Sequence, residues 1–273
     1  MNKKTFTTKK KAFSLIELAI VLIIIGLLIA GVTGGSALIK NAQLRSVMTE
    51  ARGYQTAVNG FFERFQALPG DFNKSLGVME PSETTTHGTL NGQIEHYAAH
   101  ATSSTEIGRM EGNMALQHLQ NSGFLNGITV DPASGSSAAS GVSTFVALTP
   151  GDNIPASKIS NGGWVFDYTG INAQNVVTLT GAVLAFTGTA TVNAQNVAVT
   201  GVLVPNDALS IDTKIDDGNA DSGEVRSAGG VYASGVSDDA GLVDCNTTDD
   251  PADYVTATTT AVCALSFSVD VTN

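Results

Sequence analysis

An uncharged run of 22 residues near the N-terminus limits what this chain can fold into. Residues 18–39 are Leu, Ile, Val, Ala and Gly with one Thr and one Ser, and no charge follows until Lys40. That length matches the ~20 residues that a helix needs to cross the core of a bilayer. Glu17 stands at the head of the run, where a carboxylate costs at least about 2.5–3.5 kcal/mol and needs a partner. The run therefore predicts a membrane helix with one acidic residue, Glu17, that needs a partner.

The residues around Glu17 resemble the N-terminus of type IV prepilins and type II secretion pseudopilins. Residues 9–11 are lysines, Ala12 follows, and Phe13 opens the hexapeptide FSLIEL. The resemblance implies that a prepilin peptidase cuts between Ala12 and Phe13 and then methylates the new amine of Phe13. The family usually has Gly before the cut. Ala12 is the smallest substitute for it, so the resemblance still implies cleavage, at a lower rate.

Two other classes of N-terminal segment compete with this interpretation. A secretory signal peptide would explain the lysines and could be cut among the small residues 30–37, but its apolar region normally has only 7–15 residues. A plain signal anchor would explain the length of the apolar run but gives Glu17 no role. The prepilin interpretation gives Glu17 a role in assembly, and we favour it over both.

The charge of the chain fixes its orientation and excludes one class of partner. The leader holds five lysines and no acid, so its removal takes the formal charge from −11 to −16. Such an acidic protein does not bind nucleic acid through a broad basic surface. Basic residues beside a span mark its cytoplasmic end. The sequence thus predicts a single-pass precursor in a bacterial inner membrane with its C-terminal head outside, and later an extracellular pilus or a periplasmic pseudopilus.

Spacing and composition divide the chain into four predicted parts. Residues 1–12 form the leader, and residues 13–68 form one long helix whose first half, 13–39, is the transmembrane and assembly half. An apolar stripe with spacings of three and four continues beyond the span, and Leu68-Pro69-Gly70 ends the helix. Residues 69–141 form a connecting region with a second helix near 107–124. The stripe consists of Leu44, Val47, Met48, Ala51, Tyr54, Val58, Phe61, Phe62 and Phe65.

Residues 142–273 form a β-rich head. Short runs of Val, Thr and aromatic residues alternate there with Gly, Asn and Asp, as is typical of strands and turns. Examples are VSTFVALT, GWVFDYT, NVVTLTG, AVLAF, NVAVTGVLV and VYASG. The predicted fold class is α+β, with the long helix packed on an antiparallel sheet.

An Asp-rich segment in the head is a candidate calcium loop. Asp217, Asn219 and Asp221 have the spacing of the first, third and fifth ligands of an EF-hand, and Asp216 adds a carboxylate. The following Gly comes one residue late and Ala228 stands where the bidentate Glu belongs, so the segment is not an EF-hand. The family resemblance supports Ca²⁺, because major type II pseudopilins bind it in a C-terminal loop. An Asx-rich turn explains the same residues without metal, and we favour that interpretation.

The two cysteines predict a disulfide. Cys245 and Cys263 lie close in sequence and, by the predicted topology, in an oxidising compartment. A bridge of that size contributes about 3 kcal/mol on the chain-entropy model. Type IV pilins characteristically have such a cysteine-bounded segment near the C-terminus.

The sequence predicts a structural subunit and no enzyme, since it has no GxSxG, P-loop or CxxC motif. The resemblance implies self-association into a helical filament for adhesion, motility or DNA uptake, with a prepilin peptidase and an inner-membrane assembly platform as partners. One alternative is a type II secretion pseudopilin in a periplasmic pseudopilus. The other is a membrane-anchored adhesin that never polymerises, for which Glu17 would be dispensable.

Overall fold

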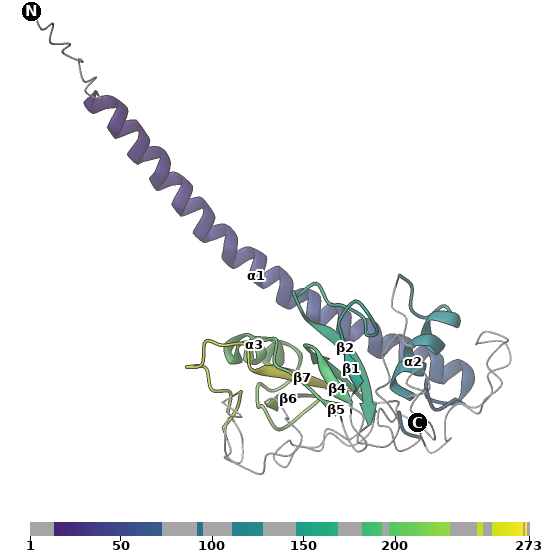
Figure 1. Cartoon of the computed structure of the whole chain (residues 1–273). Helices are drawn as coiled ribbons and strands as arrows, with labels where there is room; N and C mark the ends of the chain where they lie inside the picture. The colour runs from purple at the N-terminus through teal and green to yellow at the C-terminus, as the bar shows by residue number, and fades with distance from the viewer. Residues whose placement is uncertain are drawn as a thin grey trace, which may run out of the picture. The chain divides into compact units, whose positions relative to one another are not determined.

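The computed structural model describes residues 14–72, 92–94, 111–127, 146–168, 182–192, 197–229, 245–247, 253–269 and 271. It contains two compact units, residues 1–43 and 44–273. The elements, labelled in Figure 1, are α1 (Leu15–Phe65), α2 (Glu111–Asn121), β1 (Val146–Leu148), β2 (Gly163–Tyr168), β3 (Ala182–Thr187), β4 (Ala190–Val192), β5 (Val197–Ala198), α3 (Pro205–Ile215), β6 (Val225–Gly229) and β7 (Cys263–Ser268).

Helix α1 has 51 residues and contains no proline. It ends at Phe65, three residues before the predicted bound, because Gln66 leaves the helix with a φ of +55°. The turn that follows requires glycine at position 70. Gly70 has a φ of +89°, and a Cβ there would lie 2.3 Å from the carbonyl oxygen of Glu111. Its N–H donates to Nδ1 of the buried His118 at 2.8 Å, which holds the turn against α2.

The larger sheet is antiparallel and forms the centre of the head. Its strand order is β2-β3-β7-β6, so the last strand of the chain lies between strands that come earlier. Trp164 of β2 pairs with Phe186 of β3, and Phe186 pairs with Leu265 of β7. All three side chains are buried, so the middle of the sheet is a continuous apolar layer. A smaller antiparallel sheet has the order β1-β4-β5.

The second half of α1 packs on this larger sheet. The Tyr54 ring lies 5.6 Å from that of Trp164, and the Gln55 side-chain amide donates to the carbonyl of Ser268 at 2.8 Å. These contacts reach both β2 and β7. The predicted stripe is the buried face of the helix, with Met48, Phe62 and Phe65 only partly buried. The predicted α+β class is confirmed. The fully buried members of this face are Leu44, Val47, Ala51, Tyr54, Ala57, Val58 and Phe61.

Three elements of the head differ from the sequence analysis. Helix α3 lies in a region that the analysis treats as strands and turns, although Pro205 at its first turn and Lys214 in its last are ordinary helix signals. Strands β6 and β7 were not anticipated, because VRSAG and CALSFS mix small and polar residues with few β-branched ones. Helix α2 begins at Glu111, the first described residue of the predicted second helix. The expected runs NVVTLTG and VYASG lie outside the described residues.

Candidate functional site

The predicted cleavage point lies just outside the described part of the chain. Ala12 and Phe13 are not described, and the description begins at Ser14. Cleavage and methylation at these two positions therefore stay predictions. The first described residues do show how the helix after the cut begins.

The Glu17 side chain satisfies a backbone N–H group at the N-terminus of α1, as the Glu of a capping box does. Ser14 is the residue before the helix, and its backbone N–H donates to Oε2 of Glu17 at 2.8 Å. A Glu three residues after a helix-capping Ser satisfies in this way one of the N–H groups that have no partner within the helix. Its charge also lies at the positive end of the helix dipole. Glu17 thus has a local structural role that the sequence analysis missed, although Ser-x-x-Glu is a recognisable signal.

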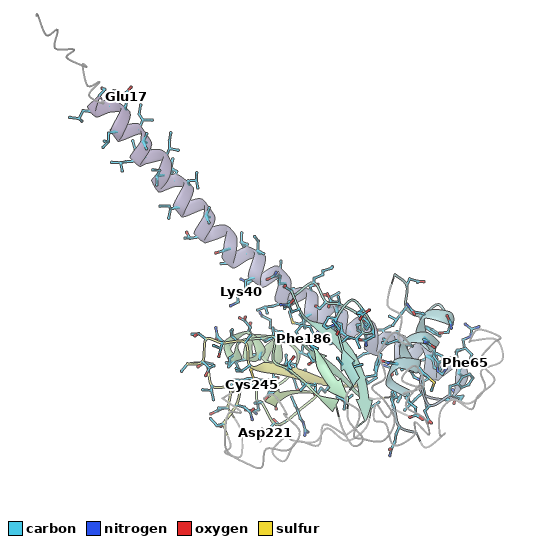
Figure 2. All side chains as sticks on the ribbon, in the orientation of Figure 1. Glu17, Lys40, Phe65, Phe186, Asp221 and Cys245 are labelled. Atoms are coloured by element: carbon cyan, nitrogen blue, oxygen red, sulfur yellow. A yellow bond between two sulfur atoms is a disulfide. The ribbon has the colours of Figure 1, made fainter. Side chains whose placement is uncertain are left out.

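The turns after Glu17 form an apolar surface on every side of the helix. Within the described residues, α1 is the one helix that is long and apolar enough to cross a membrane, judged by length and composition. Figure 2 draws the side chains of this segment as sticks, and the large apolar ones in residues 15–39 are exposed. Leu15 is 89% exposed, Leu27 72% and Leu38 73%. A soluble monomer rarely exposes a continuous apolar patch of this extent, so this segment is suited to lipid or to other protein.

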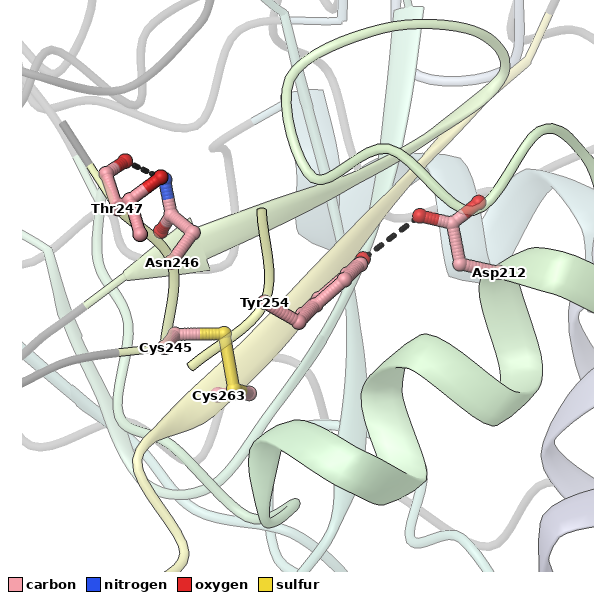
Figure 3. Close-up of a disulfide and its surroundings, with 6 residues drawn as sticks. All are labelled: Asp212, Cys245, Asn246, Thr247, Tyr254 and Cys263. Atoms are coloured by element: carbon pink, nitrogen blue, oxygen red, sulfur yellow. Dashed lines mark hydrogen bonds between the residues drawn. A yellow bond between two sulfur atoms is a disulfide. The ribbon is translucent and has the colours of Figure 1, made fainter. Parts of the chain in front are cut away.

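Cys245 and Cys263 form a disulfide in the structure, the pair that the sequence analysis expects. Their Cα atoms are 5.0 Å apart, and both side chains are buried. Cys263 is the first residue of β7, so the bridge attaches the preceding segment to a central strand (Figure 3). Gly201 lies close to the backbone of Val262 and Cys263. A Cβ at position 201 would lie 2.1 Å from the carbonyl carbon of Val262.

A buried hydrogen bond connects the cysteine-bounded segment with α3. The hydroxyl of Tyr254 donates to Oδ2 of Asp212 at 2.8 Å (Figure 3), and both residues are buried. Burial raises the pKa of Asp212 to about 6 against the opposing effect of the Tyr254 hydrogen bond. Burial and the neighbouring Asp212 carboxylate also raise the pKa of Tyr254. This hydrogen bond is stronger when Asp212 is ionised. Burial, however, favours the protonated carboxyl.

The Asp-rich segment is a turn in which carboxylates accept backbone N–H groups. Oδ1 of Asp217 accepts from the N–H of Asn219 at 2.8 Å, and its Oδ2 accepts from the hydroxyl of Ser222 at 2.6 Å. The Ser222 hydrogen bond is the main cause that lowers the pKa of Asp217. Oδ2 of Asp216 accepts from the N–H groups of Glu224 and Val225. These contacts are those of an Asx-rich turn.

The set of side chains that could hold a cation differs from the predicted one. Asp212, Asp216 and Asp217 each offer a carboxylate oxygen within 4.8 Å of the others, a separation that ligands at 2.3–2.6 Å from Ca²⁺ can have. Among the predicted carboxylates, Asp221 does not belong to this set. Oδ1 of Asp221 is buried and has no hydrogen-bond partner among the described residues. Asp212 was missed because it lies one helical turn before the motif. Calcium binding stays an untested alternative to the Asx-rich turn.

The family comparison agrees with the N-terminal geometry. Residues 7–33 match the family model described as the prokaryotic N-terminal methylation motif, which is the signature of type IV prepilins and pseudopilins. The match contains Glu17, its capping partner Ser14 and most of the apolar surface. No curated protein and no solved structure matches the chain. The match supports a prepilin-type N-terminus, and it does not extend to the head.

Proposed function

We propose that the chain is a type IV pilin-like structural subunit. A prepilin peptidase removes residues 1–12, an inner-membrane assembly platform receives the mature chain, and the subunits polymerise into a helical surface filament for adhesion, motility or DNA uptake. The observation that carries the proposal is the match of residues 7–33 to the methylation motif. The exposed apolar turns of α1 support it, because copies of such a helix can cover one another once they leave the membrane.

Glu17 selects the docking position of an incoming subunit. Cleavage creates a free amine on Phe13, and an α-amino group is mostly protonated at neutral pH. Opposite charges about 4 Å apart attract by roughly 4 kcal/mol at an effective dielectric of 20. That exceeds an exposed salt bridge, which contributes about 0–1 kcal/mol. In a staggered filament the Glu17 carboxylate pairs with the Phe13 amine of the neighbouring subunit.

The hydrogen bond between Ser14 and Glu17 provides a test that separates assembly from helix stability. Glu17→Gln keeps a side chain that can accept from the Ser14 N–H and removes the charge, whereas Glu17→Ala removes both. We expect both variants to be expressed, inserted and cleaved, and both to lose most filaments in electron micrographs of sheared cells. Glu63→Gln, an exposed acid on the same helix, is the matched control and should leave piliation normal. Normal filaments from Glu17→Gln would mean that Glu17 acts only through its hydrogen bond to Ser14, and normal filaments from both variants would mean that Glu17 is dispensable for assembly. Absence of filaments from the unaltered chain would support a non-polymerising anchored adhesin.

A periplasmic pseudopilus is the second candidate. The specific observation in its favour is the group of Asp212, Asp216 and Asp217, since the family resemblance associates a calcium loop with major pseudopilins. Immunogold labelling of intact cells distinguishes the two candidates. Labelled surface fibres support the pilus, while label that appears only after the outer membrane is opened supports the pseudopilus.

A further inference from the structure

The turns of α1 between residues 41 and 62 carry two cations and one acid. Arg45 and Arg52 are exposed and seven residues apart, so they share one face of the helix about 10 Å apart along its axis. The acid, Glu50, is engaged with the sheet. Its Oε2 accepts from the indole N–H of Trp164 at 2.9 Å, and its Oε1 accepts from the Ser46 hydroxyl at 2.8 Å.

The cations on this face of α1 have no partner in the described part of the chain. Neither the Arg45 nor the Arg52 guanidinium has a hydrogen-bond or ion-pair partner among the described residues. The neighbouring cation Arg64 differs, because it lies over the Phe65 ring at 5.1 Å. Arginine forms forked hydrogen bonds with carboxylates, so two such side chains on one face fit an acidic surface.

Acidic residues are concentrated in the C-terminal part of the sequence. Residues 205–273 hold 13 acidic and 2 basic residues. Part of this excess is in what we call the acidic loop, residues 216–224, which contains Asp216, Asp217, Asp221 and Glu224. Asp217 and Glu224 are exposed. The Glu224 carboxylate has no partner among the described residues, so it is available for an external cation.

We propose that the face of α1 with Arg45 and Arg52 binds the acidic loop of a second copy of this chain. The proposal rests on the proposed polymerisation and specifies a contact within it. Assembly through residues 15–39 brings the next turns of α1 against neighbouring heads, where an unpaired guanidinium loses water and needs an anion. Mature subunits with a formal charge of −16 repel one another, and contacts between this face and the acidic loop offset that repulsion.

Charge reversal in the full-length chain tests the contact. We expect Arg45→Glu/Arg52→Glu to lower the yield of sheared filaments about tenfold, and Asp217→Lys/Glu224→Lys to do the same, since like charges then face each other. A chain with all four changes should return to within about twofold of wild type, because the pairs are restored with opposite sign. Lys158→Glu makes the same change in net charge as either single arginine reversal, at an exposed lysine that belongs to neither surface, and should assemble normally.

A fold control accompanies each variant. Asp217 accepts hydrogen bonds within the loop, so its replacement can disturb the turn, and the Tm of the full-length chain in detergent is measured for every variant. Where that Tm falls, Arg52→Glu with Glu224→Lys serves as the second pair, because the Glu224 carboxylate takes no part in the turn.

Three results would overturn the proposal, and they differ from one another. Wild-type yield from Arg45→Glu/Arg52→Glu refutes this contact alone. Loss without restoration in the four-change and the single-pair chains means that the face binds something else, such as anionic lipid. Absence of filaments from the unaltered chain refutes the proposed function itself.

Discussion

The two halves of α1 are equally helical and have opposite surroundings. In residues 15–39 the large apolar side chains are 47–89% exposed, whereas the buried face between Leu44 and Phe61 is at most 8% exposed. The first half is apolar on every side, and the second has one apolar stripe with polar residues opposite it. The periodicity of the apolar residues therefore distinguishes a helical segment that packs on the core of its own chain from a segment that contacts lipid or other copies of the chain.

The difference assigns separate tasks to the two halves. The second half stabilises the head, because it packs on β2 and β7 of the same chain. The large apolar side chains of the first half are exposed, so this half presents surface to other partners. Substitutions in the two halves should therefore affect different measurements.

The largest expected effect is on the core of the head. Phe61 is fully buried, and its ring lies 4.5 Å from that of Phe65. Phe61→Ala should cost about 3–5 kcal/mol of unfolding free energy. The matched change Ile23→Ala, at a side chain 62% exposed, should leave the unfolding of the head unchanged. Thermal unfolding of the full-length chain in detergent measures both. Equal losses of unfolding free energy in the two variants would contradict separate roles for the two halves of α1.

The disulfide is the next largest contribution, and it belongs to the head alone. Replacing both Cys245 and Cys263 by Ala should lower the free energy of unfolding by about 3 kcal/mol, since the unfolded chain gains the freedom that the bridge removes. Insertion and cleavage, which depend on the first half of α1, should be unaffected. Denaturant unfolding measures the first effect, and immunoblotting of precursor and mature chain measures the second. Accumulation of precursor would show that the two halves are coupled.

The smallest predicted effect is a pH dependence at Asp212. The folded state holds this proton up to about pH 6, whereas a carboxyl with the ordinary pKa of 3.8 releases it earlier. The resulting stability is complete below pH 3.8 and is lost as the pH rises through 6. Relative to Asp212→Asn, the wild-type head should therefore gain stability as the pH falls from 7 to 5, by at most about 1.4 kcal/mol per pH unit.

Calcium supplies the control for that measurement. The titration is done with chelator, and we expect added Ca²⁺ to leave the melting curve at pH 7 unchanged, as the Asx-rich turn predicts. A rise in Tm with Ca²⁺ that is absent in Asp212→Asn would instead establish a metal site at Asp212, Asp216 and Asp217.

The sequence predicts long-period features of this molecule well and local exceptions poorly. The α+β class and the buried stripe of α1 follow from apolar periodicity, which extends over many residues. Strand β7 carries Cys263 and occupies the middle of the sheet. Its small and polar residues have low strand propensity, so the sequence does not indicate a strand there. Pairing with its neighbours, rather than its own propensity, makes it a strand.

The candidate site shows the same limit. Glu17 stands out because one charge interrupts an apolar environment, so composition is enough to find it. The hydrogen bond between Asp212 and Tyr254 joins residues 42 positions apart, and no local pattern indicates which distant residues will meet. The pairing of Glu50 with Trp164 was missed for the same reason.

The most direct test of the account is the N-terminus of the mature protein. We propose that the exposed apolar half of α1 begins the mature chain and builds the filament. Mass spectrometry of the subunit from sheared filaments should then find an N-terminal peptide that begins at Phe13 with one methyl group on its amine. A chain that begins at Met1, or one cut within residues 30–37, would contradict the account, because the surface proposed for assembly would then be blocked or removed.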